Sequence, residues 1–306
     1  MAVLIPCRDE AVAIAGVVRE FARYLPGAAL HVYDNNSTDG TAEAARAAGA
    51  IVRREPRPGK GSVVRRMFAD VEADIYVLVD GDGTYDAAAA PAMLRLLVDD
   101  ALDMVNATRV DEAVGAYRPG HRLGNAVLTG IVARLFGREI TDMLSGYRVF
   151  SRRFVKSFPA LATGFETETE FTVHALSLRM PVGEHPSAYR ERPSGSESKL
   201  RTWSDGLRIL RTIVLLVKEE RPLAFFAAAA GMLLALAVLL AVPVVATYLR
   251  TGLVPRLPTA VLSTGLVLLS FLALACGLIL DSVARGRREA KRLAYLRLPS
   301  VAAGGR

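Results

Sequence analysis

Short apolar and β-branched runs alternate with longer segments rich in Ala, Arg and Glu along the first eighty or so residues. This alternation is typical of a parallel sheet with helices on both faces. We predict strands at 2–5, 30–33, 51–54 and 75–80. The last run is apolar from 75 to 79, as expected of a central strand covered on both sides.

Two much longer apolar runs occupy the last third of the chain. Residues 223–248 and 257–280 contain no charged side chain, and each run exceeds the roughly 20 residues that cross a hydrocarbon core. A buried helix of a soluble protein can be equally apolar, but two such runs separated by a short turn favour the membrane. We therefore predict two transmembrane helices that form a hairpin.

Basic side chains concentrate before the first apolar run and after the second, whereas the loop between the two runs holds only Arg250 and Arg256. The positive-inside rule then predicts that both ends of the chain are cytoplasmic. The apolar stretch before Cys7 is too short for a secretory signal. The flanking basic residues are Arg208, Arg211, Lys218, Arg221, Arg285, Arg287, Arg288, Lys291, Arg292 and Arg297.

The predicted organisation is a cytoplasmic α/β domain (1–200), an amphipathic interfacial helix (201–222), the two spans and a basic tail (281–306). Trp203, Leu207 and Leu210 recur at helical spacing in the interfacial segment. The net charge is +7, and the basic residues concentrate beside the spans. This distribution favours a membrane surface over nucleic acid as the partner. The two cysteines provide neither a disulfide framework nor a zinc cluster.

Candidate chemistry begins at the end of the predicted central strand, in the turn Asp80-Gly81-Asp82-Gly83-Thr84. Ligands of open α/β sheets bind at the carboxyl ends of the strands. With carboxylates at alternate positions, one can face a donor molecule while the other binds a divalent cation. The glycines allow the ligand to approach the backbone closely. An acidic turn alone is more often a solvated loop, so its position after a buried strand carries the interpretation.

The first two strands run into the turns Pro6-Cys7-Arg8-Asp9-Glu10 and Asp34-Asn35-Asn36-Ser37-Thr38-Asp39-Gly40-Thr41. Both turns should emerge at the same sheet edge as Asp80. We expect the second turn to cap a helix, because Ser, Thr and Asp accept hydrogen bonds from free helix N–H groups. We also expect it to present Asp34 to a nucleoside.

The motifs P-x-x-x-E, D-x-x-S-x-D-G-T and D-x-D therefore occur in this order, and together they resemble the family-2 glycosyltransferases with the GT-A fold. More narrowly, the chain resembles polyisoprenyl-phosphate glycosyltransferases, which include dolichyl-phosphate mannose synthases and bacterial undecaprenyl-phosphate glucosyltransferases. Gly59-Lys60-Gly61, residues 142–148 (D-M-L-S-G-Y-R) and residues 192–199 (R-P-S-G-S-E-S-K) are similar to further motifs of that group. The implied fold is GT-A, a Rossmann-like and mainly parallel sheet, followed by the membrane hairpin.

The resemblance implies a nucleotide-sugar donor and a divalent cation, Mg or Mn. Asp80, Asp82 and Thr84 correspond to the metal site, with Asp82 as the direct ligand. Oxygen ligands suit these metals, and the lack of Cys/His clusters argues against zinc. Glu168 is a possible sugar contact, although glutamates also favour helix N-termini. The implied donor-binding residues are Pro6, Arg8, Glu10, Asp34, Asn36, Lys60, Asp80 and Gly81.

The resemblance also implies a polyprenyl phosphate acceptor and assigns arginines to its phosphate. Two departures from the group's pattern are Ala126, where a hydroxyl residue is usual, and one extra residue between Gly195 and Ser198. An ionised phosphate is itself the nucleophile, so positioning is the main task and Asp142 would orient rather than remove a proton. The implied acceptor residues are Arg109, Arg122, Arg148, Arg192, Ser198 and Lys199.

The predicted reaction is an inverting transfer of a hexose or N-acetylhexosamine from a UDP- or GDP-sugar to an undecaprenyl- or dolichyl-type phosphate. Two alternatives are a processive polysaccharide synthase and a catalytically inactive membrane scaffold. A Q-x-x-R-W element, which is typical of the synthases, is reduced here to Arg201-Thr202-Trp203, and the intact acidic turn argues against the scaffold. The family analogy suggests a tetramer, and the sugar stays open.

Overall fold

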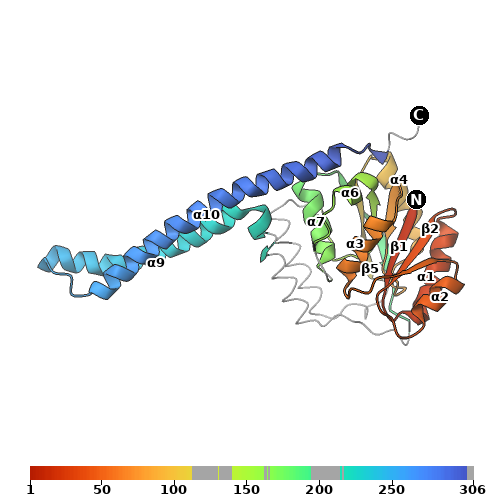
Figure 1. The fold of residues 1–306 in the computed structure, drawn as a ribbon, viewed down its shortest axis with the longest axis horizontal. Helices are drawn as coiled ribbons and strands as arrows, with labels where there is room; N and C mark the ends of the chain where they lie inside the picture. Colours follow the sequence, from red (N-terminus) through yellow and green to blue (C-terminus); the bar gives the residue numbers. More distant parts are fainter. Residues whose placement is uncertain are drawn as a thin grey trace. The chain divides into compact units, whose positions relative to one another are not determined.

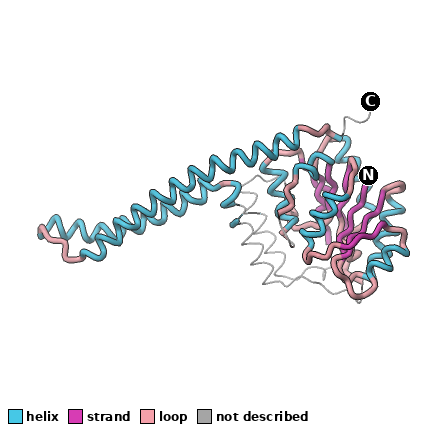
Figure 2. Tube along the Cα trace, in the orientation of Figure 1, coloured by secondary structure: helices cyan, strands magenta, loops and turns pink. Residues whose placement is uncertain are grey.

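The computed structural model describes residues 1–111, 130, 140–161, 164, 166–193, 214–215 and 217–301. The chain divides into two compact units. The sheet unit comprises Met1–Ile213 together with Ala290–Arg306, and the hairpin unit comprises Val214–Glu289. Every described strand belongs to the sheet unit, whereas the hairpin unit is helical (Figure 2).

The described part of the sheet unit contains a seven-stranded sheet with the order β3-β2-β1-β4-β6-β5-β7. The first four strands in the chain are parallel neighbours, whereas β6 runs antiparallel to β4 and β5, and β7 is parallel to β5. The strands are β1 (Ala2–Cys7), β2 (Ala29–Asp34), β3 (Ile51–Arg54), β4 (Ile75–Leu78), β5 (Met104–Asp111), β6 (Arg148–Ser151) and β7 (Val182–Tyr189).

The four predicted parallel strands are confirmed. Cys7 pairs with Asp34 between β1 and β2, and Leu4 pairs with Leu78 between β1 and β4. The carboxyl ends of these strands consequently open at one edge of the sheet, as the sequence predicted. β4 lies between β1 and β6, and the side chains of Tyr76, Val77 and Leu78 are buried, as expected of a central strand.

Helices cover both faces of the sheet and form two apolar cores (Figure 1). One core joins helices α1, α2 and α4 to the sheet and includes Phe21 and Met93. The other joins α3, α6 and α7 and contains a cluster of aromatic rings around Phe68 and Phe171. The helices are α1 (Ala11–Tyr24), α2 (Thr41–Ala47), α3 (Lys60–Asp70), η1 (Ala87–Ala89), α4 (Ala90–Asp99), α6 (Arg152–Ser157) and α7 (Thr167–Ser177).

The hairpin unit contains α9 (Pro222–Thr251) and most of α10 (Leu257–Leu296), and both helices are long and apolar enough to cross a membrane. The predicted spans lie inside these two helices. From Ala230 in α9 and from Ser263 in α10, the buried residues recur every seven positions. Ser270 Oγ donates to the carbonyl of Ala230 at 2.9 Å. A Cβ on Gly277 would lie 2.9 Å from Phe226 Cβ, so a small residue allows close packing there.

Large apolar side chains cover the outer faces of both helices. Leu239, Leu249 and Phe271 are among the most exposed of them. Such faces fit lipid rather than water, and they make a soluble core helix a poor description of either segment. The interfacial helix predicted at 201–222 lies largely outside the described residues, which resume at Val214 and Leu215.

Candidate active site

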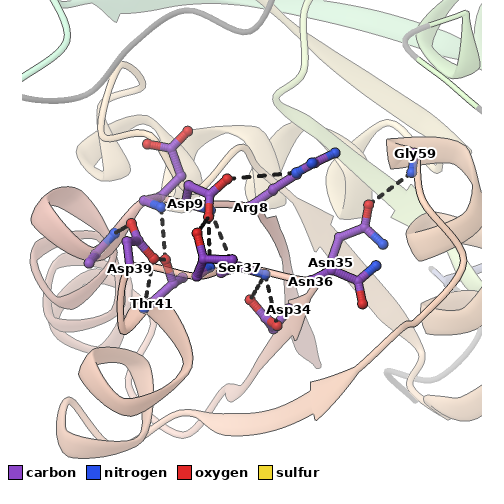
Figure 3. Close-up of polar contacts among 12 residues, drawn as sticks. Arg8, Asp9, Asp34, Asn35, Asn36, Ser37, Asp39, Thr41 and Gly59 are labelled. Atoms are coloured by element: carbon purple, nitrogen blue, oxygen red, sulfur yellow. Dashed lines mark hydrogen bonds and ion pairs between the residues drawn. The ribbon is translucent and has the colours of Figure 1, made fainter.

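Side-chain hydrogen bonds join the turns that follow β1 and β2 (Figure 3). The backbone N–H of Glu10 donates to Thr41 Oγ1 at 2.8 Å. The carboxylate of Asp39 accepts from the N–H of Ala11 at 3.0 Å and from the N–H of Thr41 at 3.0 Å. Ala11 and Thr41 begin α1 and α2, so one carboxylate of the turn accepts from the first N–H of two helices. The N-cap residues themselves, Glu10 and Gly40, supply no side-chain capping bond.

The end of β2 supplies a second set of contacts that reach the start of α3. Asp34 is buried, and its two carboxylate oxygens lie 3.3 Å from the N–H of Ser37. Asn35 donates to the carbonyls of Glu55 and Arg57, and its Oδ1 accepts from the N–H of Gly59 at 2.8 Å (Figure 3). These bonds position the turn that carries Lys60.

The acidic turn follows β4 and packs closely against β1. A Cβ on Gly81 would overlap the Sγ of Cys7, so this position requires glycine. Asp82 is buried, and its Oδ1 accepts from the N–H and the Oγ1 of Thr84 at 3.1 and 2.6 Å. The hydroxyl of Thr84 therefore supports the Asp82 carboxylate.

Lys60 links the acidic turn to α7. Its ammonium is nearly buried, lies 2.5 Å from Asp80 Oδ1 and also pairs with Glu168 Oε1. Burial alone would lower the pKa of Lys60, but the two carboxylates outweigh burial and raise the pKa above its usual value. Burial raises the pKa of Asp80 to about 6, although Lys60 opposes that shift. The Oε2 of Glu168 is buried and has no hydrogen-bond partner among the described residues.

The loop that ends in Gly146 lies directly against the carboxylate of Asp80. A Cβ on Gly146 would overlap this carboxylate, so only glycine leaves room for it. The N–H of Gly146 donates to the hydroxyl of Tyr85 at 2.8 Å. The backbone of Tyr85 forms an isolated antiparallel β-bridge with Tyr189 at the end of β7. The motif at 142–148 and the acidic turn are thus parts of one site.

Arg192 places a cation over the acidic turn. Its guanidinium lies 2.6 Å from Asp82 Oδ2 and 3.5 Å from Glu10 Oε1. The N–H of Arg190 donates to the carbonyl of Thr84 at 2.8 Å and so holds the chain beyond β7 beside the turn. Three predicted site residues from separate motifs, Glu10, Asp82 and Arg192, therefore meet.

Arg109 and Asp142 form a two-pronged ion pair with little exposure to solvent. The Nε and Nη2 of Arg109 donate to the two oxygens of Asp142, each at 2.7 Å. Asn106 donates to the carbonyl of Asp142 at 2.8 Å and to Glu184 at 2.9 Å. The Arg109 guanidinium also lies 5.5 Å from the ring centre of Tyr189. Both oxygens of Asp142 therefore bind the guanidinium of Arg109 and orient it.

Arg148 occupies a different place from the one its motif suggested. Its side chain is fully buried, and its guanidinium donates to the carbonyls of Ser145 and Met143 and to the hydroxyl of Thr172. The ring of Phe171 lies 5.7 Å away. Burial lowers the pKa of Arg148 to about 10, so the side chain stays charged at neutral pH. A guanidinium enclosed in this way shapes the 142–148 loop and has no exposed surface to offer a phosphate.

Comparison with known proteins identifies the family. Residues 2–158 match the family described as glycosyl transferase family 2. The chain belongs to glycosyl transferase family 2. A relative named glycosyltransferase AglJ, from Haloferax volcanii, is 34% identical over 225 residues, which cover 73% of this chain and 74% of that protein. A second protein of that organism, named dolichyl-phosphate hexose transferase, is 28% identical over 223 residues, which cover 72% of this chain and 95% of that protein.

Comparison with solved structures confirms the GT-A type of fold. Glucosyl-3-phosphoglycerate synthase from Mycobacterium tuberculosis, in complex with Mn²⁺, uridine diphosphate and glucosyl-3-phosphoglycerate, superposes with a TM-score of 0.55. The match has 24% sequence identity and covers 70% of this chain and 78% of that one. The chain is therefore a glycosyltransferase with an α/β sheet of the GT-A type, and its hairpin adds two helices that fit a membrane.

The acidic turn of this glycosyltransferase offers ligands suited to a hard divalent cation. The carboxylates of Asp80 and Asp82 are of the kind that Mg and Mn prefer. Among the described residues no group of three or more His, Cys, Asp or Glu side chains is placed so that it could hold a metal ion. A cation here would accordingly need phosphate oxygens or water as further ligands. Arg192 already binds Asp82 Oδ2, so its guanidinium competes with a cation for the charge of that carboxylate.

The contact between Gly146 and Asp80 yields a sharp prediction. Gly146→Ala is expected to lower the rate of glycosyl transfer by roughly 100-fold, because the added methyl group moves a carboxylate of the site. The matched control is Gly16→Ala in α1, where an added Cβ meets nothing within 4 Å and transfer should be unchanged. Initial rates and the midpoint of thermal unfolding are measured for both. Equal rates for the two variants would show that Asp80 tolerates displacement.

The remaining predicted residues fall into two groups. Pro6 is half-buried in β1, Arg8 is exposed beside Asp9, and Asn36 binds the carbonyl of Pro56 at 2.9 Å. Arg122, Ser198 and Lys199 lie outside the described residues, as does Ala126.

Sequence reasoning missed several supporting residues. The hydroxyl of Tyr85, the Asn106–Glu184 bond and the loop contacts of Asn35 carry no local pattern that would have indicated them.

Proposed function

We propose that this glycosyltransferase moves a hexose or N-acetylhexosamine, with inversion, from a UDP- or GDP-sugar to a polyprenyl phosphate at the cytoplasmic membrane face. The name of the Haloferax dolichyl-phosphate hexose transferase supports this acceptor class, and the hairpin would keep the enzyme beside a lipid. The basic residues that flank the spans support cytoplasmic ends. In this proposal residues 1–200 bind both substrates and 201–222 lie along the membrane surface.

The donor would bind across the carboxyl ends of β1, β2 and β4. Asp34 and Glu10 would face the nucleoside, and Asp82 would hold a divalent cation, Mg or Mn, with help from Asp80 and Thr84. The cation would neutralise charge on the leaving diphosphate. The UDP and Mn²⁺ named in the mycobacterial neighbour support these choices. The buried Oε2 of Glu168 could accept a hydrogen bond from a sugar hydroxyl.

The Arg109–Asp142 pair carries the proposal for the acceptor. A general base must have an oxygen available for the proton, yet both oxygens of Asp142 accept from Arg109. A phosphate acceptor is already ionised and needs no base, so an arginine oriented in this way suits it. A sugar hydroxyl, which a processive polysaccharide synthase would use, lacks that advantage. Arg122, Arg192, Ser198 and Lys199 would complete the phosphate contacts.

Screening the full-length protein tests this function directly. Purified enzyme in lipid vesicles with undecaprenyl phosphate and Mg or Mn is given labelled UDP- and GDP-sugars in turn. We expect one donor to yield a labelled product that extracts into chloroform and releases its sugar in mild acid. Water-soluble polymer instead would indicate a processive synthase. Failure of every donor with both metals would contradict the enzyme proposal for lipid acceptors.

A further inference from the structure

A buried carboxylate on the sheet unit binds the far end of the chain. Asp103 immediately precedes β5 and is fully buried. Its Oδ1 accepts from Ser151 Oγ at 2.7 Å and also pairs with Arg153. Its Oδ2 accepts from the hydroxyl of Tyr295 at 2.8 Å. A carboxylate so far from solvent is costly unless its oxygens are paired, and Tyr295 supplies the partner of one of them.

Tyr295 lies in the last turn of α10 and makes more than this one bond. The guanidinium of Arg153 lies 4.7 Å from the centre of its ring, which is within cation–π distance. The ring also packs against the core that contains Phe68, and Val301 packs against the other core. Burial raises the pKa of Tyr295 to about 12, so its hydroxyl remains a donor at neutral pH.

Other side chains of the same turn face away from the sheet unit. Leu293 is 60% exposed and Leu296 is 65% exposed. Tyr295, and not these two leucines, is therefore the side chain of this turn that packs on the sheet unit. A basic tail that served only as a solvated topology signal would not need a tyrosine inserted beside a buried aspartate.

The order of the units along the chain gives this contact a consequence. The hairpin unit is inserted between Ile213 and Ala290 of the sheet unit, so the chain joins the two units twice. The second junction lies within α10, which continues as helix from Leu257 to Leu296. The Tyr295 contact therefore fixes the point at which the chain that returns from the second span attaches to the sheet unit.

We propose that Tyr295 is a positioning residue for the acceptor reaction: by binding Asp103 it anchors the returning end of α10 and keeps the site within reach of a lipid in the bilayer. The inference rests on the proposed function, since it assumes a membrane-borne acceptor. A stiff attachment raises the effective concentration of a tethered site, whereas a loose one spreads it over a larger volume. The residue touches neither substrate.

The test compares Tyr295→Phe with wild type in full-length protein in vesicles. Phenylalanine keeps the ring over Arg153 and removes only the hydroxyl that Asp103 accepts. Leu293→Ala, at the exposed position two residues earlier, is the matched control. Kinetics are measured with undecaprenyl phosphate in the bilayer and with farnesyl phosphate, a short prenyl phosphate, added from solution. Amide hydrogen exchange of residues 290–296 is measured in the same samples, independently of activity.

For Tyr295→Phe we expect the apparent KM for the bilayer acceptor to rise about fivefold, with kcat and the KM for farnesyl phosphate unchanged. Exchange in 290–296 should quicken by about tenfold, because a hydrogen bond to a buried charge is lost. Leu293→Ala should change neither quantity. Equal losses with both acceptors would reduce Tyr295 to a stabilising role, and unchanged exchange would refute the anchor.

The two arms separate this inference from the proposed function. If wild-type protein glycosylates neither phosphate, the proposed function fails and the positioning role falls with it. The exchange measurement still decides whether Tyr295 holds the end of α10. If wild type is active and only the split between the two acceptors is missing, the positioning role alone is overturned.

Discussion

Asp82→Ala is expected to abolish glycosyl transfer while membrane insertion stays unchanged. Asp82 is the buried carboxylate of the acidic turn, and the proposed cation would be held there against the leaving diphosphate. Removing one such electrostatic contact slows enzymes by roughly 100- to 1000-fold, and loss of the cation itself should bring transfer below detection. Initial rates with labelled donor measure the effect, and resistance to alkaline extraction from membranes measures insertion.

Asp82→Asn controls for the fold, because an amide oxygen can still accept from Thr84. Binding of Mn²⁺, followed by its electron paramagnetic resonance signal, should be weakened in both Asp82 variants. Arg192→Gln should have the opposite effect on the metal, because it removes a guanidinium that competes for Asp82 Oδ2. Transfer retained by Asp82→Ala, or Mn²⁺ binding equal to wild type, would remove the metal role from Asp82.

The parallel half of the sheet could be predicted from the sequence because its signals are local. Short segments that begin with apolar or β-branched residues, each followed by a polar turn, mark β1 to β4 and the edge at which they end. The pairings of β5, β6 and β7 depend on contacts between distant segments, and no pattern in the sequence specifies them. The long apolar helices were predicted for the same local reason, by length and the absence of charge.

The candidate site was predictable in its parts but not in its pairings. The motifs correctly indicated Asp34, Asp80 and Asp82 at one sheet edge. The contact of Lys60 with Glu168 spans 108 residues, and only the fold brings the two together. Arg192 was expected at a phosphate, and the structure places it on Asp82.

Arg148 shows why a motif does not reveal burial. Gly146 of the same motif lies against Asp80, yet Arg148 is the first residue of β6, whose four side chains are all buried. The apolar Val149 and Phe150 that follow it were a signal that the arginine enters the core. A fully buried guanidinium survives there because carbonyl oxygens of the loop accept its hydrogen bonds.

Lys60→Met is expected to lower both stability and activity. The ammonium of Lys60 neutralises Asp80 and Glu168 within a nearly buried cluster. Removing one partner of a buried ion pair leaves uncompensated charge and typically costs roughly 3–5 kcal/mol. For a domain of this size the apparent midpoint of thermal unfolding should fall by about 10 °C. Transfer should fall as well, because Asp80 loses the cation that holds it beside Gly146.

A double variant separates these two effects. Lys60→Met leaves the buried charge of Glu168 without its partner, and Glu168→Gln removes that charge. Lys60→Met/Glu168→Gln should therefore recover more than half of the stability lost in Lys60→Met. Activity should not return, because Asp80 still lacks its partner and the sugar contact proposed for Glu168 is altered. Thermal unfolding and initial rates of the four proteins complete the cycle. Strict additivity of the two single-variant stability losses would mean that Lys60 and Glu168 do not interact, which would contradict the ion pair on which the geometry of Asp80 depends.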